Sequence, residues 1–504
     1  MISNFFKIAL RPLFCALMFI ISISLNAQVG IGTTNPDASS VLDLTSTTQG
    51  LLTPRMTTLL RTAIASPANG LMVYDTDLNA LHYYDSSISN WTKVQANSRL
   101  KFKRIKSTDV LATVLAEEKT AGGGSKYLLD SSTLYEINGV ISVDLPIELN
   151  NAYISGLDSS DDKLVKTSGD LFTGTTGGNI RLLTITVTGG GKVFNLLGTG
   201  TQTLNFRDAI VRGCNNVGNI DDFYYVFNSI VLYTNNTTGI VYKNINKLLL
   251  SNTAWFSDNT GTFEKLEGTF GSVIKQGGFM EVTGSSIGFD VSSNPIVNDA
   301  VMETVVFNGT LTSGKYVNPY TAGGYTNYNF NNNWTIRCAG IPTEGDAQAT
   351  GNLYFDRTQV SPTVTPNATN AATPYSKVPG TTIATNLFRL GTGIAPVSSA
   401  DNRLQYVGKK TRTFALNATI SFVTTSGTNS DHVFFFVKFN SSGVATVLNS
   451  TETYVSTDSN QALNLSLAGT VQMNSGDYVE LHVARVAGES SKVLTIKSFN
   501  IAMD

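Results

Sequence analysis

In the middle of the chain, short runs of apolar residues alternate with Asn, Thr and Gly, and these runs recur at a nearly constant spacing in the sequence. Three segments can be aligned in one register: LNFRDAIV (204–211), YVFNSIVL (225–232) and YKNINKLLL (242–250). Ile210, Ile230 and Leu248 then correspond, at separations of 20 and 18 residues. Each is preceded by a polar residue two positions before it and an apolar or aromatic residue six before it: Asp208, Asn228 and Asn246, and Leu204, Tyr224 and Tyr242. This repeat predicts a parallel β-helix, in which equivalent positions of successive coils stack.

The repeat extends beyond these three coils in both directions. Upstream, the odd positions from Ile137 to Leu149 are nearly all apolar and the even positions mostly polar, which is typical of a half-buried strand. Downstream, less regular bursts follow at GTFGSVI, SSIGFDV and AVMETVVF. We therefore predict a right-handed parallel β-helix over residues 126–313. The competing interpretation is an antiparallel sandwich of short strands, which gives no reason for the coincident amide and aromatic columns.

The N-terminal part of the chain has a different pattern. In residues 28–96, Thr57 and Thr58 can cap a short helix that Pro67 ends, and three short strands follow: LMVYD, ALHYY and WTKV. Residues 97–125 predict a helical cap or linker, because polar residues that favour helix starts precede an amphipathic stretch.

The distal part of the chain contains longer alternating strands. Residues 381–504 hold five of them, separated by turn signals: RTFALNATISFV, HVFFFVKFN, ALNLSLAGTVQM, GDYVELHVARV and KVLTIKSFNIAM. This pattern predicts a jelly-roll β-sandwich. Before it, residues 314–356 predict a small β unit that closes the β-helix, and the prolines of residues 357–380 predict an extended linker. The expected fold class is all-β, with a β-helical shaft, a C-terminal jelly roll and a small mixed N-terminal module.

The N-terminus predicts export from the cell. Lys7 and Arg11 precede an apolar run that ends at Ala27, so residues 1–27 have the features of a cleaved signal peptide. No later segment reaches the length of a membrane span, and the mature chain is therefore expected outside the cytoplasm with no membrane span.

Composition excludes some partners. Charged residues make up only 14% of the chain and its net charge is −2, which gives no electrostatic reason to expect nucleic acid or an anionic membrane as a partner. With Cys15 in the signal peptide, Cys214 and Cys338 leave either one disulfide or two buried free thiols.

Residues 29–94 resemble a module of known proteins. The matching elements are the IGTTNP opening, ASSVLDL, GLLTPRMTT and SPANGLMVYDTD. They resemble the N-terminal module of many exported surface proteins of the Bacteroidota and of tail-fibre proteins of their phages. The resemblance implies a piece for attachment or assembly and not a reaction.

Two further segments carry resemblances. YEINGVISVDLPIELNNAYISGLDSS resembles the entry coils of phage tail-spike and pectate-lyase-like β-helices. SGDYVELHVARV with the strand after it resembles the trimeric jelly rolls of the complement-like and tumour-necrosis-factor-like class. That class assembles around a threefold axis, which implies a homotrimer. Phe434 to Phe436 could then serve either the core or the trimer interface.

Candidate chemistry is sparse in this sequence. No motif supports a catalytic residue, a metal site or a cofactor. The alternative is polysaccharide cleavage by a carboxylate pair, for which two clusters are available: Asp221 with Asp222, and Glu264 with Glu267. The simpler interpretation of both clusters is a solvated turn. Trp255 and Trp334 could offer flat apolar faces to sugar rings if they point outward.

These observations predict an exported fibre or spike. We expect an adhesin or receptor-binding protein that binds a cell-surface ligand, such as a glycan, without catalysis. The alternatives are a β-helical polysaccharide depolymerase, either hydrolase or lyase, and a passive structural appendage. The expected location is extracellular or at the cell surface, with a virion tail as the alternative.

Overall fold

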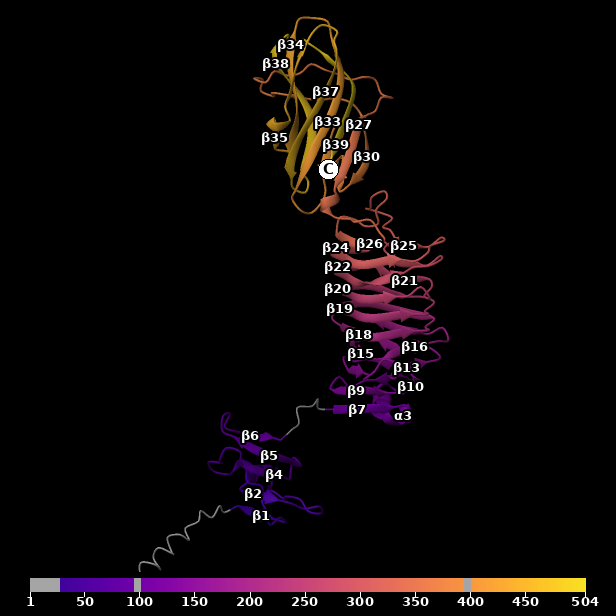
Figure 1. Cartoon of the computed structure of the whole chain (residues 1–504), viewed down its shortest axis with the longest axis vertical. Coiled ribbons are helices and arrows are strands. Elements are labelled where there is room, and N and C mark those ends of the chain that lie inside the picture. The colour runs from indigo at the N-terminus through magenta and orange to yellow at the C-terminus, as the bar shows by residue number, and fades with distance from the viewer. Residues whose placement is uncertain (1–27, 95–100, 394–399) are drawn as a thin grey trace, which may run out of the picture. The chain divides into compact units, whose positions relative to one another are not determined.

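The computed structural model describes residues 28–94, 101–393 and 400–504, and its contacts divide the chain into a first unit up to Ser98 and a second from Arg99 onwards. The predicted signal peptide, residues 1–27, lies outside the described residues. The chain is nearly all-β, with about 5% helix, a β-solenoid of about eight turns and a C-terminal β-sandwich (Figure 1). This confirms the predicted fold class. The right-handed sense of the solenoid stays a prediction.

The first unit is a set of short strands with one short helix. Two strands pair in parallel, and four others form one sheet: β1 (Val29–Ile31) and β2 (Leu42–Leu44), then β3 (Arg55–Met56), β4 (Met72–Asp75), β5 (Ala80–Asp85) and β6 (Asn90–Lys93). Helix α2 (Thr58–Thr62) begins after Thr57, whose hydroxyl accepts the N–H of Leu60, so the predicted cap is confirmed. The three predicted strands correspond to β4, β5 and β6.

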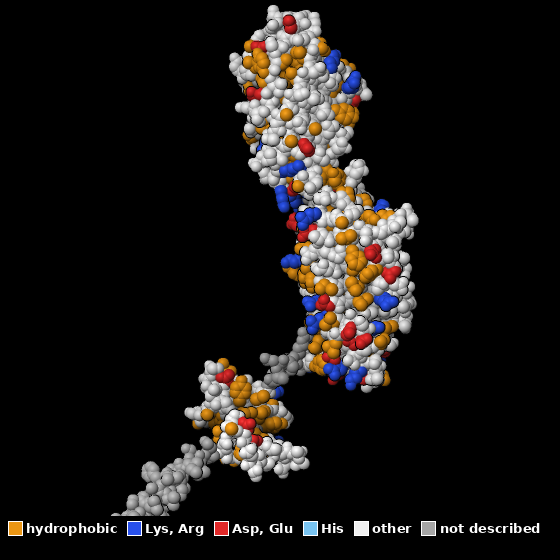
Figure 2. All heavy atoms as spheres, viewed as in Figure 1, with side chains coloured by type: hydrophobic (Ala, Val, Ile, Leu, Met, Phe, Trp, Pro, Cys, Tyr) orange, Lys and Arg blue, Asp and Glu red, His pale blue; other side chains and the backbone are white. Residues whose placement is uncertain are grey.

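The first unit buries little of its apolar surface. Its buried hydrophobic residues are Val73 and Ala80, and a buried ion pair joins Arg61 Nε to Asp75 Oδ2 at 2.8 Å. Hydrophobic side chains, in orange, are prominent on the visible face of this unit (Figure 2). The large apolar residues that are exposed are Val29, Ile31, Val41, Leu42, Leu44, Leu51, Leu52, Leu59, Leu60, Leu71, Met72, Leu78, Ile88 and Val94. The exposed large apolar side chains in residues 28–94 therefore outnumber the buried ones.

The second unit begins with the solenoid, whose parallel strands stack on three faces. The first face contains β7 (Lys101–Lys106), β9 (Thr133–Asn138), β12 (Tyr153–Ser155), β15 (Gly178–Arg181), β18 (Thr203–Arg212), β19 (Asn216–Thr234), β20 (Ile240–Trp255), β22 (Thr269–Glu281), β24 (Ile296–Asn308) and β26 (Trp334–Ala339). Figure 1 shows these strands lying one above another.

The other two faces use shorter strands and further parts of the long ones. The second contains β10 (Val140–Ser142), β13 (Lys163–Lys166) and β16 (Thr184–Val187), and continues in the later parts of β18, β19, β20, β22 and β24. The third contains β8 (Tyr127–Leu128), β11 (Ile147–Glu148), β14 (Phe172–Gly174), β17 (Lys192–Leu197), the earlier parts of β19 and β20, β21 (Thr262–Glu267), β23 (Ile287–Asp290) and β25 (Lys315–Asn318).

The register between coils differs from the predicted one. Leu204 pairs with Val226 and Val226 with Leu248, so these coils repeat every 22 residues, and the next step, to Val273, takes 25. The predicted alignment of Ile210, Ile230 and Leu248 is wrong, because Ile210 pairs with Leu232 and Leu248 pairs with Val226. A shift of two residues leaves the alternation of inward and outward side chains unchanged, so alternation alone could not choose the register.

The predicted amide ladder exists, but other residues form it. Asn236 and Asn259 are almost completely buried inside the solenoid, on successive coils. The N–H of Cys214 donates to Asn236 Oδ1 at 3.0 Å, and the N–H of Asn236 donates to Asn259 Oδ1 at 3.0 Å. Asn259 Nδ2 in turn donates to the carbonyl of Tyr233 at 2.7 Å. The ladder therefore satisfies backbone groups where the coil turns.

Cys214 and Cys338 are both free thiols, which excludes the disulfide alternative, but Cys338 is only partly buried. Cys214 lies in the core, and burial raises the pKa of its thiol to about 12.

The solenoid is closed at both ends. Helices α3 (Leu111–Val114) and α4 (Ala116–Ala121) follow β7, and Leu111 and Leu115 belong to the core of the first coils. At the other end, the buried carboxylate of Glu344 accepts the N–H groups of Asn329 and Phe330 at 2.7 and 2.9 Å. Burial raises the pKa of Glu344 to about 7. The solenoid core thus runs from Ile105 to Ile336, further in both directions than the predicted 126–313.

The β-sandwich consists of two antiparallel sheets. One contains β30 (Thr382–Phe388), β27 (Thr350–Phe355), β39 (Leu494–Met503), β33 (Arg412–Thr424) and β37 (Ala462–Met473), with β28 (Thr363–Val364) on β39. The other contains β31 (Leu390–Gly391), β32 (Leu404–Tyr406), β38 (Tyr478–Gly488), β34 (Ser430–Phe439) and β35 (Ala445–Val447), with β29 (Ser376–Lys377) on β38 and β36 (Thr453–Thr457) on β34. Two 3₁₀ turns complete the second unit: η1 (Asp346–Gln348) and η2 (Asn449–Thr451).

The sandwich includes the expected linker and buries the three consecutive phenylalanines. The expected linker, residues 357–380, supplies β28 and β29 and is therefore part of the sandwich. Phe434 and Phe436 lie in its main core, whereas Phe435 is buried in a second, smaller cluster.

The corners of the solenoid place single residues in the left-handed conformation. One corner column contains Leu182, Asp208, Ile230, Asn252, Gly277 and Thr304, with φ between 51° and 65°. Gly and Asn adopt this conformation readily, whereas a β-branched residue is strained in it. Ile230 has φ 54° and is 53% exposed, so it contributes strain and little burial.

Exchanging the residues of this corner column should change stability in opposite directions. Ile230→Asn should raise the free energy of unfolding by about 0.5–1 kcal/mol, because it relieves left-handed strain without removing a buried side chain. Asn252→Ile, the reverse change on the next coil, should lower it by a similar amount. Denaturant unfolding of the two variants and the parent measures both. A lower midpoint for Ile230→Asn would contradict the corner assignment.

Candidate functional site

The two tryptophans expected to face a ligand are buried in the solenoid. The ring of Trp255, at the end of β20, stacks between Tyr233 and Phe263, with ring centroids 3.9 and 5.1 Å away. Trp334 in β26 packs in the core, and its Nε1 donates to Tyr320 Oη at 3.0 Å. Both are 0% exposed, so the prediction that they offer ring faces to sugars is wrong. The sequence indicated that these two tryptophans lie near the ends of coils, but it could not show that their side chains point inward.

Glu264 is also an interior residue and not part of a solvated turn. It lies in β21 with 0% exposure, and its Oε2 is 2.9 Å from Lys275 Nζ. Trp255 Nε1 donates to its Oε1 at 2.9 Å, and Lys275 Nζ also donates to Thr253 Oγ1 at 3.0 Å. These four side chains form a closed polar cluster, which we call the internal ion pair cluster. Its carboxylate is enclosed by protein and is not presented to a polysaccharide.

The sequence analysis missed Lys275. It occupies an inward position that pairs with Leu250 on one side and Met302 on the other. Only the correct register reveals that a lysine stands between Leu250 and Met302 in an inward column.

The remaining candidate carboxylates lie on the outer surface. Asp221, Lys243 and Glu267 share one column of the third face, on three successive coils. Asp221 Oδ2 pairs with Lys243 Nζ at 3.1 Å, and Glu267 Oε1 pairs with Lys265 Nζ at 2.6 Å.

Neither predicted carboxylate pair is assembled. Asp222 occupies a corner with φ 58°, next to Asp221 in the chain but outside its column, and Glu264 points inward while Glu267 faces outward. With coils about 4.8 Å apart, two coils separate Asp221 and Glu267 by about 9.6 Å, the upper end of the inverting range. Lys243 stands between them, which suits a charge ladder better than a catalytic pair. Catalysis by these residues stays an untested prediction.

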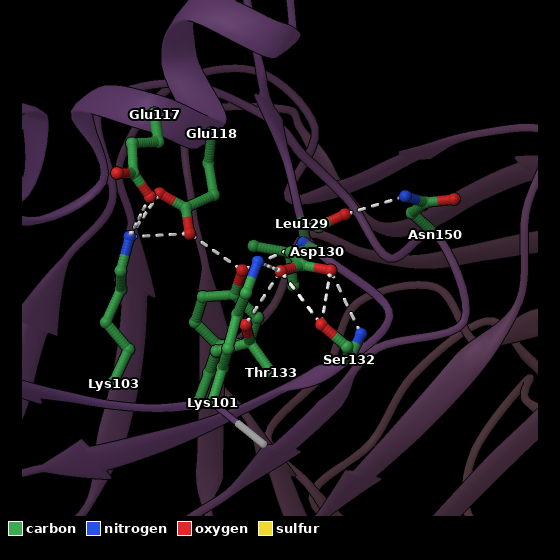
Figure 3. Close-up of polar contacts among 10 residues, drawn as sticks. Lys101, Lys103, Glu117, Glu118, Leu129, Asp130, Ser132, Thr133 and Asn150 are labelled. Carbon is green, nitrogen blue, oxygen red and sulfur yellow. Dashed lines mark hydrogen bonds and ion pairs between the residues drawn. The ribbon is translucent and has the colours of Figure 1, made fainter. Parts of the chain in front are cut away.

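A polar cluster connects the capping helices to the first coils (Figure 3). Lys103 Nζ on β7 lies 2.8 Å from both carboxylate oxygens of Glu118 on α4, and Tyr135 Oη on β9 donates to Glu118 Oε1 at 2.7 Å. Asp130 accepts from Lys101 Nζ at 2.7 Å, and this hydrogen bond holds the pKa of Asp130 well below its usual range. A cleft of about 340 Å³ adjoins these residues. Because the buried charges are paired, the cluster serves to fasten the cap.

A second cleft, of about 730 Å³, lies where the solenoid's closing segment meets the sandwich, and we call it the junction cleft. It is lined by Thr326, Asn327, Tyr328, Pro342, Thr350, Ala384, Thr385, Asn386 and Leu387. None of these carries a charge. The Tyr328 ring stacks on Phe388 with centroids 3.9 Å apart, and Asn386 stands at an irregularity in the pairing of β30 with β27, with φ 53°. Bulges of this kind redirect side chains next to binding sites.

The chemistry of the junction cleft suits an uncharged polar ligand. The structure gives the side chains of Asn327 and Asn386 no hydrogen-bond partner among the residues it describes, so both amides are available as donors and acceptors. Amides and hydroxyls around an aromatic and aliphatic surface match the alternating polar and apolar surface of a neutral sugar.

The histidines of the sandwich do not come together. His432 is buried beside Thr457, and burial together with Arg485 lowers its pKa to about 4. His482 lies on the opposite face of the sheet, with Nε2 3.3 Å from Glu480 Oε2. Within residues 28–94, 101–393 and 400–504, no group of three or more His, Cys, Asp and Glu side chains could hold a metal ion. The same residues contain no helix long and apolar enough to cross a membrane.

Comparison with known proteins adds one family match. Residues 30–108 match the model of a family described as the phage tail like trimerisation region. No curated protein matches the chain.

Two solved structures are among the similar folds. The enzymatically active domain of tailspike protein 4 from bacteriophage CBA120 is 10% identical with a TM-score of 0.22, covering 90% of this chain and 77% of that one. Murine APRIL is 8% identical with a TM-score of 0.19, covering 31% of this chain and 98% of that one. At these scores neither likeness carries an argument about function.

The internal ion pair cluster predicts a large loss of stability when one partner is removed. Glu264→Ala leaves the Lys275 ammonium without a counter-charge in the solenoid, which should cost about 3–5 kcal/mol in the free energy of unfolding. Glu264→Leu combined with Lys275→Met removes both charges and should recover most of the loss. Denaturant unfolding measures both. An unchanged midpoint for Glu264→Ala would show that the carboxylate is not enclosed as described.

Proposed function

We propose that this chain is one subunit of a trimeric fibre or spike of the phage-tail type, which binds a cell-surface glycan without cleaving it. The observation that carries the proposal is the match of residues 30–108 to a phage tail like trimerisation region, directly followed by a β-solenoid. The matched range extends into the solenoid, because β7 covers Lys101–Lys106. Trimerisation and a stacked shaft are the two properties that a fibre or spike needs.

The exposed apolar residues of the first unit support self-association. Within residues 28–94, the buried hydrophobic residues are only Val73 and Ala80, so this part of the unit would gain stability by covering its surface with another chain. Each apolar side chain that becomes fully covered contributes about 1.5–3 kcal/mol, so the side chains from three copies together can stabilise a trimer.

The junction cleft supports a glycan as the ligand. It lies between the solenoid's closing segment and the sandwich, joins uncharged hydrogen-bonding groups to the Tyr328 ring, and is large enough for a short saccharide. The absence of an assembled carboxylate pair at the predicted positions favours binding over cleavage. The proposed location is extracellular, on a cell surface or in a virion tail.

The trimer is tested by molar mass. We expect the mature full chain to have three times the mass of one subunit in light scattering, and Leu52→Glu to shift it towards monomer, because Leu52 is 80% exposed in the first unit. Val360→Glu is the matched control, since Val360 is 92% exposed in the second unit. A monomeric parent, or a Leu52→Glu variant that stays trimeric, would count against this interface.

Glycan binding is tested at the junction cleft. Asn386→Gly removes the amide while keeping a residue suited to φ 53°, and should weaken binding to neutral cell-surface polysaccharide about tenfold. Asn460→Gly, with φ 50° elsewhere in the sandwich, should leave the dissociation constant unchanged. Surface plasmon resonance measures both. Equal affinities would remove the cleft from the proposal, and release of reducing sugar ends by the parent would favour the depolymerase alternative instead.

A further inference from the structure

A third hollow, on the second face of the solenoid, has a different chemistry from the junction cleft. It has a volume of about 310 Å³ and spans the strands β13, β16 and β18 on three successive coils, with the loop 157–162 at its rim. Its lining residues are Ser159, Ser160, Lys163, Thr184, Thr186, Ile210 and Arg212. We call it the shaft groove.

The two cations of the shaft groove have no counter-ions. Neither Lys163 nor Arg212 has a side-chain hydrogen bond or an ion pair in the part of the chain that the structure describes. Other solenoid lysines are engaged: Lys192 Nζ donates to Asn219 Oδ1 at 2.8 Å and Lys243 pairs with Asp221. The groove therefore holds two positive charges, which favour an anion.

Acidic residues close to the groove do not neutralise these cations. Asp158, Asp161 and Asp162 belong to the rim loop, but none of them lines the groove. Asp162 is turned into the protein, where its carboxylate accepts the N–H groups of Gly139, Leu157 and Asp158 at 2.7, 2.7 and 3.0 Å. Burial opposes the charged form of Asp162, but these hydrogen bonds outweigh it and lower its pKa.

The rim of the groove is held in place before any ligand arrives. The three hydrogen bonds to Asp162 fix the loop, and Thr184 Oγ1 donates to the carbonyl of Ser159 at 2.6 Å, which ties the loop to β16. Because the cations stand on strands and the rim is fixed, binding would cost little conformational entropy.

The remaining groups of the groove match a sugar more closely than a simple anion. The hydroxyls of Ser159, Ser160 and Thr186 can each donate and accept, as sugar hydroxyls require, and Ile210 supplies a small apolar surface. Two cations, on the first and third of three successive coils, are too few for nucleic acid, which needs a continuous basic surface.

We propose that the shaft groove binds an acidic saccharide, with a uronate carboxylate or a sugar sulfate held between Lys163 and Arg212. The inference rests on the proposed function, in that the chain binds a surface glycan, and it adds that this glycan carries acidic sugars. The groove is separate from the junction cleft, so one heteropolysaccharide could occupy both.

The test uses the full chain and defined sugars. We expect alginate tetrasaccharide, a uronate oligomer, to bind in isothermal titration calorimetry and maltotetraose to bind at least tenfold more weakly at this groove. Raising the salt concentration from 50 to 300 mM should weaken uronate binding several-fold, because two charges are involved. Lys163→Gln combined with Arg212→Gln should reduce uronate affinity at least tenfold and abolish most of the salt dependence.

The control is a second double variant of the same chain. Lys106→Gln with Lys497→Gln removes two exposed positive charges outside the groove and should leave uronate binding unchanged. Equal uronate affinity in the groove variant, or inorganic phosphate binding as tightly as the uronate, would overturn the proposal.

Failure of this inference can be told apart from failure of the proposed function. If the parent binds whole cells saturably but no acidic sugar, the shaft groove proposal falls and the proposed function stands. If it binds neither cells nor sugars, the proposed function falls as well.

Discussion

The structure depends on the stacking of successive coils in register. A single coil, of 22 to 27 residues in the central part of the solenoid, cannot bury its own inward side chains, and its backbone pairs with the coils above and below. Stacking therefore has two requirements. Side chains at equivalent positions of successive coils must point the same way, and successive coils must turn at equivalent residues. The left-handed corner column and the Asn236–Asn259 ladder meet these two requirements. The open ends need caps for the same reason, and α3, α4 and the segment around Glu344 supply them.

This requirement decides where chemistry can lie. Inward positions are enclosed, so a polar group there must find its partner inside, as Glu264 does with Lys275. The large aromatic residues expected to bind sugars, Trp255 and Trp334, are used as core. Ligands can reach only the outward columns, the corners and the ends of the shaft. The shaft groove and the junction cleft are both of this kind, and strands or fixed loops support their side chains.

The two hollows differ in charge. The junction cleft contains no charged side chain, whereas the shaft groove presents Lys163 and Arg212 without counter-ions. Trimerisation through the first unit would present each hollow three times, and linked sites bind a repeating polymer more tightly than any one site alone. This arrangement fits the proposed function, which is to bind a surface polysaccharide without cleaving it.

The sequence by itself determined the repeat, the fold class and the helix start at Thr57, because these follow from local alternation and capping. It did not determine the register, since a shift of two residues preserves every inward and outward position in a strand, and so the Ile210–Ile230 alignment was wrong. The burial of Glu264 and its pairing with Lys275 follow only from the register. The junction cleft joins Tyr328 to Asn386, and the shaft groove joins Lys163 to Arg212. No local pattern brings such distant residues together, so only the tertiary structure decided where a ligand could bind.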